Sequence, residues 1–125
     1  MPKILIAEDD IILAEMYSSR FQLESLEVIV ANDGKEALKK IYEEKPDLII
    51  LDIMMPKKSG MAVLEEVREK KGFTSTPIII LTALSNLKMK EKAQELGARY
   101  IVKSEILLPK LVDAVKSELG LTISR

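Results

Sequence analysis

Residues 48–56 read LIILDIMMP. The first four residues, 48–51, form an apolar run that stops at the acidic Asp52. A short, uniformly apolar run of this kind is typical of a strand that is buried on both faces of a parallel sheet. Asp52 follows the run directly and has apolar residues after it as well, so its charge would be costly there without a partner. The stretch therefore predicts a buried parallel strand with a functional carboxylate at its end.

Short apolar runs recur along the rest of the chain, at 4–7, 28–31, 78–81 and 100–102. The segments between them have apolar residues at helical spacing, for example at 37, 38 and 41 and at 111, 112, 115 and 119. Strands that are joined by helices run parallel, and right-handed crossovers place the helices on both faces of the sheet. The sequence therefore predicts an α/β fold with a doubly wound, five-stranded parallel sheet.

Residues typical of helix ends support this pattern. Asp33–Gly34 is expected to open the second helix, and the Lys-Pro-Asp sequence at 45–47 to end it. Gly97 is expected to close the fourth helix, and Pro109 suits the first turn of the fifth. Asp10 stands where it can cap the first helix.

Length and composition narrow the possible functions. A chain of 125 residues suits one domain, which we place at 1–125, with 119–125 as a fraying helix end or linker stub. The chain has no cysteine and no histidine, which excludes disulfides, structural zinc sites and triads built on either residue. Its net charge of -1 supplies no general attraction to nucleic acid or to an anionic membrane. No apolar run approaches a signal peptide or a membrane span, so we expect a soluble cytoplasmic protein.

Polar side chains follow four of the predicted strands. Glu8 and Asp9 follow the first strand, Asp52 the third, Thr82 the fourth and Lys103 the fifth. In an open parallel sheet, ligands bind outside the carboxyl ends of the strands. We therefore expect these side chains to form one site at that edge.

The chemistry of this set indicates a metal and a phosphoryl group. Three carboxylates in close proximity repel one another unless a cation lies among them. Glu8, Asp9 and Asp52, with the backbone carbonyl of Met54, suit the oxygen shell of Mg²⁺, or of Mn²⁺ in its place. With the charge neutralised, Asp52 can act as a nucleophile toward a phosphoryl donor and form an aspartyl phosphate.

The remaining polar residues suit the same reaction. Lys103 can supply positive charge to a nonbridging phosphoryl oxygen, and Thr82 can donate a hydrogen bond from its hydroxyl. Taken singly, these residues have simpler explanations, since acidic residues before a helix often cap it and a strand-end threonine or a solvated lysine is ordinary. Their joint placement at the strand ends favours a functional site.

The motifs that carry a family resemblance are ILIAEDD at 4–10, DIMMP at 52–56, Gly60, LTA at 81–83, Gly97-Ala98 and Lys103. Over essentially its whole length the chain resembles the receiver domain of two-component response regulators. The resemblance implies a flavodoxin-like (βα)5 fold with strand order 2-1-3-4-5. It also implies a signalling domain that promotes only its own phosphoryl transfer and autodephosphorylation.

Site roles follow from the resemblance, position by position. Asp52 would be the phosphoacceptor, and Glu8 and Asp9 the acidic pair that holds the metal, with Asp9 as the direct ligand. Thr82 would be the switch hydroxyl, and Lys103 the charged partner of the phosphoryl group. Tyr100, which composition alone would place in the core, would be the aromatic residue that turns inward on activation.

The resemblance also implies partners. The phosphoryl donor would be a phosphohistidine on a sensor histidine kinase or a histidine phosphotransfer protein. The surface formed by the fourth helix, fifth strand and fifth helix would signal to a downstream protein or output domain. We expect a monomer or a phosphorylation-dependent dimer, with no direct contact to nucleic acid or membrane.

The chain departs from the family pattern at three places. Glu8 stands where aspartate is commoner, which keeps the charge but lengthens the side chain. The segment between Gly97-Ala98 and Lys103 is one residue shorter than usual. Ser104 stands where the family usually has a cis proline, and because a cis Lys-Ser bond would cost about 2.5–4 kcal/mol we expect a trans bond.

Three other functions share parts of this pattern. A flavodoxin-like cofactor carrier needs a Ser/Thr/Gly-rich loop after the first strand, where this chain has Glu8, Asp9 and Asp10. A phosphatase of the haloacid dehalogenase type needs a second acid two residues after its nucleophile, where this chain has Met54. A receiver-like interaction module that needs no phosphorylation remains the main alternative, and the complete set of polar residues argues against it.

Overall fold

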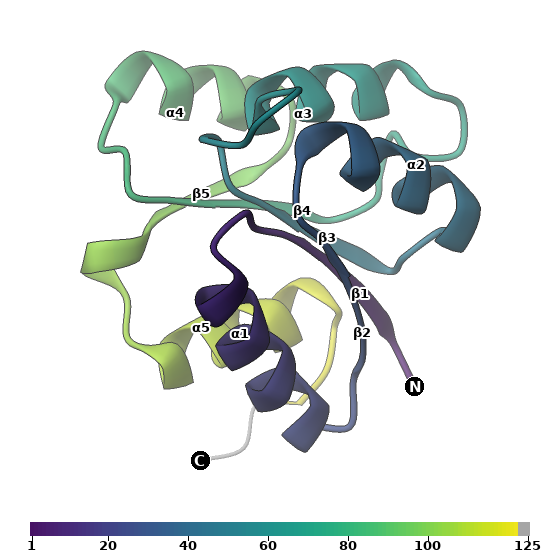
Figure 1. Cartoon of the computed structure of the whole chain (residues 1–125), viewed down its shortest axis with the longest axis vertical. Coiled ribbons are helices and arrows are strands. Elements are labelled where there is room, and N and C mark those ends of the chain that lie inside the picture. The colour runs from purple at the N-terminus through teal and green to yellow at the C-terminus, as the bar shows by residue number, and fades with distance from the viewer. Residues whose placement is uncertain (123–125) are drawn as a thin grey trace.

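A computed structural model describes residues 1–122 of the chain. Strands and helices alternate along it (Figure 1), with a short 3-10 helix at Lys103–Glu105. The strands are β1 (Lys3–Ala7), β2 (Glu27–Ala31), β3 (Leu48–Leu51), β4 (Ile78–Thr82) and β5 (Arg99–Val102). The helices are α1 (Ile11–Leu23), α2 (Gly34–Glu44), α3 (Gly60–Glu69), α4 (Leu87–Glu95) and α5 (Leu108–Glu118).

The strands form one parallel sheet in the order β2-β1-β3-β4-β5, which confirms the predicted topology. Helices α1 and α5 lie on one face of the sheet, and α2, α3 and α4 lie on the other (Figure 1). The winding direction reverses between β1 and β3. The carboxyl ends of these two central strands therefore flank the place where doubly wound proteins bind ligands.

The centre of the sheet is buried on both faces. Every residue of β3 is buried, and its side chains alternate between two apolar clusters. Ile49 and Leu51 pack with residues of α2 and α3, whereas Leu48 and Ile50 pack with residues of α1 and α5. This double burial is the reason that β3 is apolar throughout rather than alternating with polar residues.

The predicted helix ends are confirmed. The Asp10 carboxylate accepts hydrogen bonds from two first-turn amides of α1, and the Asp33 carboxylate accepts one from a first-turn amide of α2. Lys45 ends α2 in a left-handed conformation, with φ of 48°, and Gly97 follows α4 with φ of 74°. Pro109 lies in the first turn of α5.

Predicted element limits differ little from those observed. Strands β1, β2, β4 and β5 each extend one residue beyond the apolar run, because strand pairing continues through a polar or charged end residue. The peptide bonds of the described residues include no cis bond, so the bond between Lys103 and Ser104 is trans, as expected. Helix α5 ends at Glu118, and the tail predicted at 119–125 remains a prediction because 123–125 lie outside the described residues. None of the helices described is both long enough and apolar enough to span a bilayer.

Arg68, near the end of α3, ties three segments together through backbone carbonyls. Its guanidinium donates to Phe73 O and Thr76 O, at 2.9 and 2.7 Å, in the loop before β4. It also donates to Leu96 O and Gly97 O, at 2.6 and 3.2 Å, just after α4. Arg68 therefore holds the C-terminal end of α4 against α3.

We predict that Arg68→Met lowers the free energy of unfolding by about 2–4 kcal/mol, because it leaves partly buried carbonyls without their donor. Urea denaturation monitored by circular dichroism measures this loss. Arg99→Met is the matched control, because Arg99 is exposed and its contact with Glu118 spans 3.9 Å. Equal stability of the two variants would contradict the role given to Arg68.

Candidate acidic site at the carboxyl edge of the sheet

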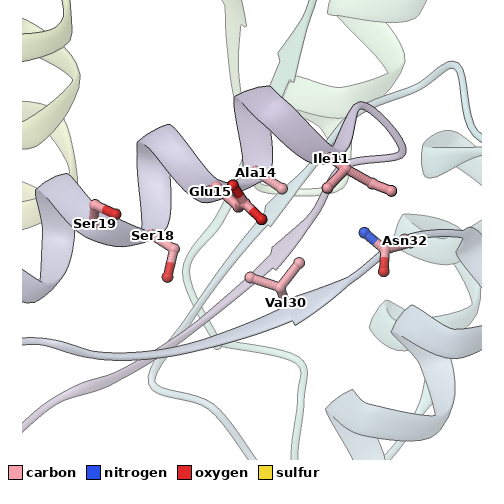
Figure 2. A pocket seen from close by; sticks show the side chains of 7 residues that line it. All are labelled: Ile11, Ala14, Glu15, Ser18, Ser19, Val30 and Asn32. Atoms are coloured by element: carbon pink, nitrogen blue, oxygen red, sulfur yellow. The ribbon is translucent and has the colours of Figure 1, made fainter.

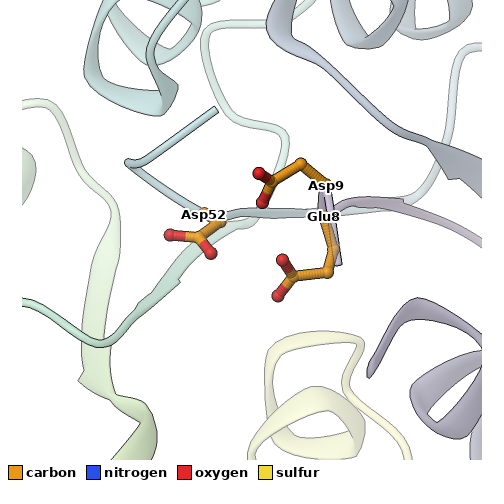
Figure 3. Close-up of side chains that lie close together, drawn as sticks. All are labelled: Glu8, Asp9 and Asp52. Carbon is orange, nitrogen blue, oxygen red and sulfur yellow. The ribbon is translucent and has the colours of Figure 1, made fainter. Parts of the chain in front are cut away.

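Three carboxylates meet where β1 and β3 end (Figure 3). One oxygen from each of Glu8, Asp9 and Asp52 lies within 4.8 Å of the others. Glu8 and Asp52 are only 3% and 6% exposed, whereas Asp9 is open to solvent. The structure therefore brings together the acidic residues that the sequence analysis selected.

Lys103 lies between the two buried carboxylates. Its ammonium nitrogen is 2.6 Å from Glu8 Oε1 and 2.8 Å from Asp52 Oδ2. The 3-10 helix that starts at Lys103 follows β5 directly, which places this side chain at the same edge of the sheet. Lys103 thus serves as the counter-ion of a pocket that would otherwise hold unbalanced negative charge.

Burial and ion pairing act in opposite directions on the pKa of these groups. Burial lowers the pKa of Lys103, but its hydrogen bonds to Asp52 and Glu8 outweigh burial and raise that pKa to about 12. On the alkaline side, the contribution of Lys103 to stability is therefore fully present below the unfolded-state pKa of 10.5 and is lost as the pH rises through about 12. Burial raises the pKa of Glu8, and the hydrogen bonds from Lys103 and the Asp10 amide offset part of that increase.

Hydrogen bonds fix the orientation of the Asp52 carboxylate. Its Oδ1 accepts the Met54 amide at 3.2 Å, and its Oδ2 faces Lys103. The Met54 side chain is exposed, so Met54 contributes backbone groups to the pocket. Both oxygens of Asp52 are held in place by neighbours before any ligand arrives.

The loop that follows Asp52 packs against two glycines. A Cβ at position 60 would lie 2.0 Å from the Asp52 carbonyl oxygen, and one at position 34 would lie 1.9 Å from the Lys58 carbonyl oxygen. No side chain fits at either place. Gly60 appeared in the sequence only as part of a motif and Gly34 only as the start of a helix, because close backbone approach has no local sequence signal.

Thr82 and Tyr100 are linked through one backbone unit. Thr82, fully buried at the end of β4, accepts the Leu84 amide with its hydroxyl at 3.3 Å. The Tyr100 hydroxyl donates to the Leu84 carbonyl at 2.6 Å. Leu84 therefore connects the edge of the acidic site to the surface between α4 and β5.

A second hollow, of about 390 Å³, lies between α1 and β2 (Figure 2). Its walls include Ile11, Glu15, Ser18, Val30 and Asn32. It shares no residue with the cluster of Glu8, Asp9 and Asp52. This hollow has no signal in the sequence, because its residues come from two segments that are unremarkable on their own.

The residues present fit a hard divalent cation. Mg²⁺ prefers oxygen ligands in an octahedral arrangement, and the cluster offers carboxylate oxygens at short mutual distances. The Glu8 oxygens already accept hydrogen bonds from Lys103 and the Asp10 amide. Both Asp52 oxygens likewise accept hydrogen bonds, from the Met54 amide and Lys103. Asp9 is open to solvent and is therefore the best placed of the three for direct contact with a metal.

Comparison with known protein families gives one clear match. The sequence model of the response regulator receiver domain matches residues 4–116. Two curated relatives, each called a probable transcriptional regulator ycf27, are similar at 40% identity over 102 residues. One is from Guillardia theta and the other from Cyanophora paradoxa. The match covers 81% of this chain and 39% and 41% of theirs, so the chain spans about two fifths of their length.

Solved structures agree with the sequence match. The receiver domain of the Francisella response regulator 1452 superposes with a TM-score of 0.87 at 32% identity, covering 96% of this chain and 98% of that one. The response regulator TrrA from Thermotoga maritima, in complex with Mg(2+)-BeF, superposes with a TM-score of 0.83 at 36% identity. That match covers 94% of this chain and 99% of TrrA.

We predict that Lys103→Met destabilises the metal-free protein by about 3 kcal/mol, because it leaves buried carboxylates without their counter-ion. Added Mg²⁺ should recover most of this loss. The dissociation constant for Mg²⁺ should also fall by about tenfold or more, since the metal no longer competes with an ammonium group. Thermal melts over a Mg²⁺ titration measure both effects. Lys110→Met, on the exposed side of α5, is the control, and identical behaviour of the two variants would rule out the counter-ion role.

Proposed function

The chain belongs to the response regulator receiver domain family, and on that basis we propose that Asp52 accepts a phosphoryl group with the help of Mg²⁺ or Mn²⁺. The observation that supports this role most directly is the surroundings of Asp52. Its carboxylate is nearly buried, faces two other carboxylates and contacts Lys103. Such a group is suited to nucleophilic attack once its charge is balanced.

The residues that would hold the metal are Asp9, Asp52 and the Met54 carbonyl, with Glu8 in support. When bound, the ion would neutralise charge on the carboxylates and on the incoming phosphoryl group. Asp52 would then form a P–O bond as the P–N bond of a phosphohistidine breaks, and the imidazole would leave with the electron pair. Lys103 is close enough to shift from the Asp52 carboxylate to a phosphoryl oxygen, and the Thr82 hydroxyl can donate to another.

The donor, on this proposal, is a sensor histidine kinase or a histidine phosphotransfer protein in the cytoplasm. The domain would promote only its own phosphoryl transfer and autodephosphorylation. The curated relatives are called probable transcriptional regulators and are more than twice as long as the matched region. We propose that the receiver domain likewise signals to an output domain or a separate protein, without contacting nucleic acid itself.

We propose that the signal leaves through the surface of α4, β5 and α5. Thr82 and Tyr100 bond to the two ends of the Leu84 backbone, so a change at the Thr82 hydroxyl would alter the position of Tyr100. Helix α4 is the element most easily moved, because Ala93 is its only buried residue. Phosphorylation would shift a two-state equilibrium rather than build a new fold.

Asp52→Ala should abolish phosphorylation by acetyl phosphate, because it removes the carboxylate that accepts from both the Met54 amide and Lys103. Intact mass measured after incubation with Mg²⁺ should show one added phosphoryl group on the parent chain and none on the variant. Asp47→Ala is the matched control, since Asp47 precedes β3 whereas Asp52 follows it. Labelling that persists in Asp52→Ala, or in excess EDTA, would refute the assignment. A parent chain that gains no phosphoryl group would instead favour the phosphorylation-independent alternative.

The output surface can be tested with beryllofluoride, which mimics the phosphoryl group. Amide chemical shifts should change near Asp52 and also at Leu84, at Tyr100 and along α4. Tyr100→Phe removes the hydrogen bond to Leu84 O, so the shifts on α4 should shrink by about half or more while those near Asp52 remain. Shift changes confined to the acidic pocket in the parent chain would contradict this route.

A further inference from the structure

Helix α1 has apolar residues on two opposite faces. Ala14, Tyr17 and Phe21 are buried and pack into the core. On the other side, Ile12 and Leu23 are each 80% exposed and Met16 is 44% exposed, with Ser19 also open to solvent. We call Ile12, Met16, Ser19 and Leu23 the α1 stripe. Surface helices normally present polar residues on the side away from the core, so this stripe calls for a partner.

The spacing of the stripe indicates what kind of partner it fits. Its members are separated by four, three and four residues, which is the spacing of the contact positions in a coiled coil. At 100° per residue, these positions form one narrow line along the helix, opposite Phe21. A line of this shape is complementary to another helix that lies nearly parallel to it, with a crossing angle near 20°.

The residues beside the stripe favour a second copy of the same helix. With Met16 and Leu23 in the a positions and Ile12 and Ser19 in the d positions, Glu15 falls in a g position and Arg20 in an e position. In a parallel pair, a g residue meets the e residue five places further along the other helix. Glu15 of each copy would therefore face Arg20 of the other, and the two charges are opposite.

The hollow between α1 and β2 borders one side of this contact. Glu15 and Ser18 line it beside the stripe, Ser19 lines it from within the stripe, and all three offer oxygen acceptors (Figure 2). Within residues 1–122, Glu15 makes no salt bridge. Arg20 already contacts Glu24 at 2.5 Å, but a guanidinium has five N–H donors and can bind two carboxylates at once.

We propose that two copies of this chain associate weakly through parallel contact of their α1 stripes. The stripe lies opposite the core face of α1, so the two domains would extend away from each other without overlap. A single helix pair buries little surface, and the polar Ser19 interrupts the seam, which places this dimer in the transient class. The proposal is independent of the phosphoryl chemistry assigned to Asp52.

Sedimentation equilibrium of the full chain, from micromolar to millimolar concentration, tests the association. The parent chain should show a reversible monomer–dimer equilibrium at the upper end of this range. Ser19→Leu should tighten it by about tenfold or more, because the new side chain is buried in both copies. Ile12→Lys should abolish it. Gln94→Leu, which adds the same apolar side chain to the exposed surface of α4, should leave it unchanged.

A charge exchange tests the parallel register. Glu15→Arg should weaken association, because two arginines would then face each other, and so should Arg20→Glu. The double variant with both changes should restore it toward the parent value. Circular dichroism checks that each variant is folded, and acetyl phosphate labelling should be unchanged in all of them.

If the parent and Ser19→Leu both remain monomeric, the proposal is wrong and the stripe serves a helix of another protein. If the double variant is no better than the singles, the parallel register is wrong.

Discussion

The contact of Lys103 with Glu8 and Asp52 is the interaction on which the arrangement of the site depends. It joins residues that follow β1, β3 and β5, which are far apart in the sequence but end at the same edge of the sheet. Without a cation in this position, two nearly buried carboxylates would repel each other in a poorly solvated place. The sheet order and the polar residues at its carboxyl edge therefore depend on each other.

The segments around the pocket differ in how tightly they are packed, and this difference suits a signalling domain. Asp52 is fixed by a wholly buried strand and by a loop packed against glycine backbone. Thr82 is equally well buried, but the chain beyond it is largely exposed, and Leu84 joins it to Thr82 and Tyr100 through hydrogen bonds. A change in charge at Asp52 would consequently be absorbed by the segment between β4 and α4 rather than by the sheet.

Much of the fold and of the candidate site was predictable because its signals are local. The uniformly apolar strands, the helix caps at Asp10 and Asp33 and the polar residues at the strand ends all follow from short stretches of sequence. Arg68 was not predictable, because its acceptors are backbone carbonyls, which every residue has. The pairing of Glu8 with Lys103 was also missed, since the longer arm of glutamate reveals its reach only in three dimensions.

The attachment of α4 by Arg68 has a mechanical consequence. The bonds to Leu96 and Gly97 hold the C-terminal end of the helix, whereas the N-terminal end lies next to Leu84 and Tyr100. Because the helix is held at its C-terminal end, a tilt of its axis displaces mainly its N-terminal end. At a rise of 1.5 Å per residue, α4 is about 13 Å long, so a tilt of about 10° moves its free end by about 2 Å. The exposed Leu87 is at that free end, where the displacement is largest.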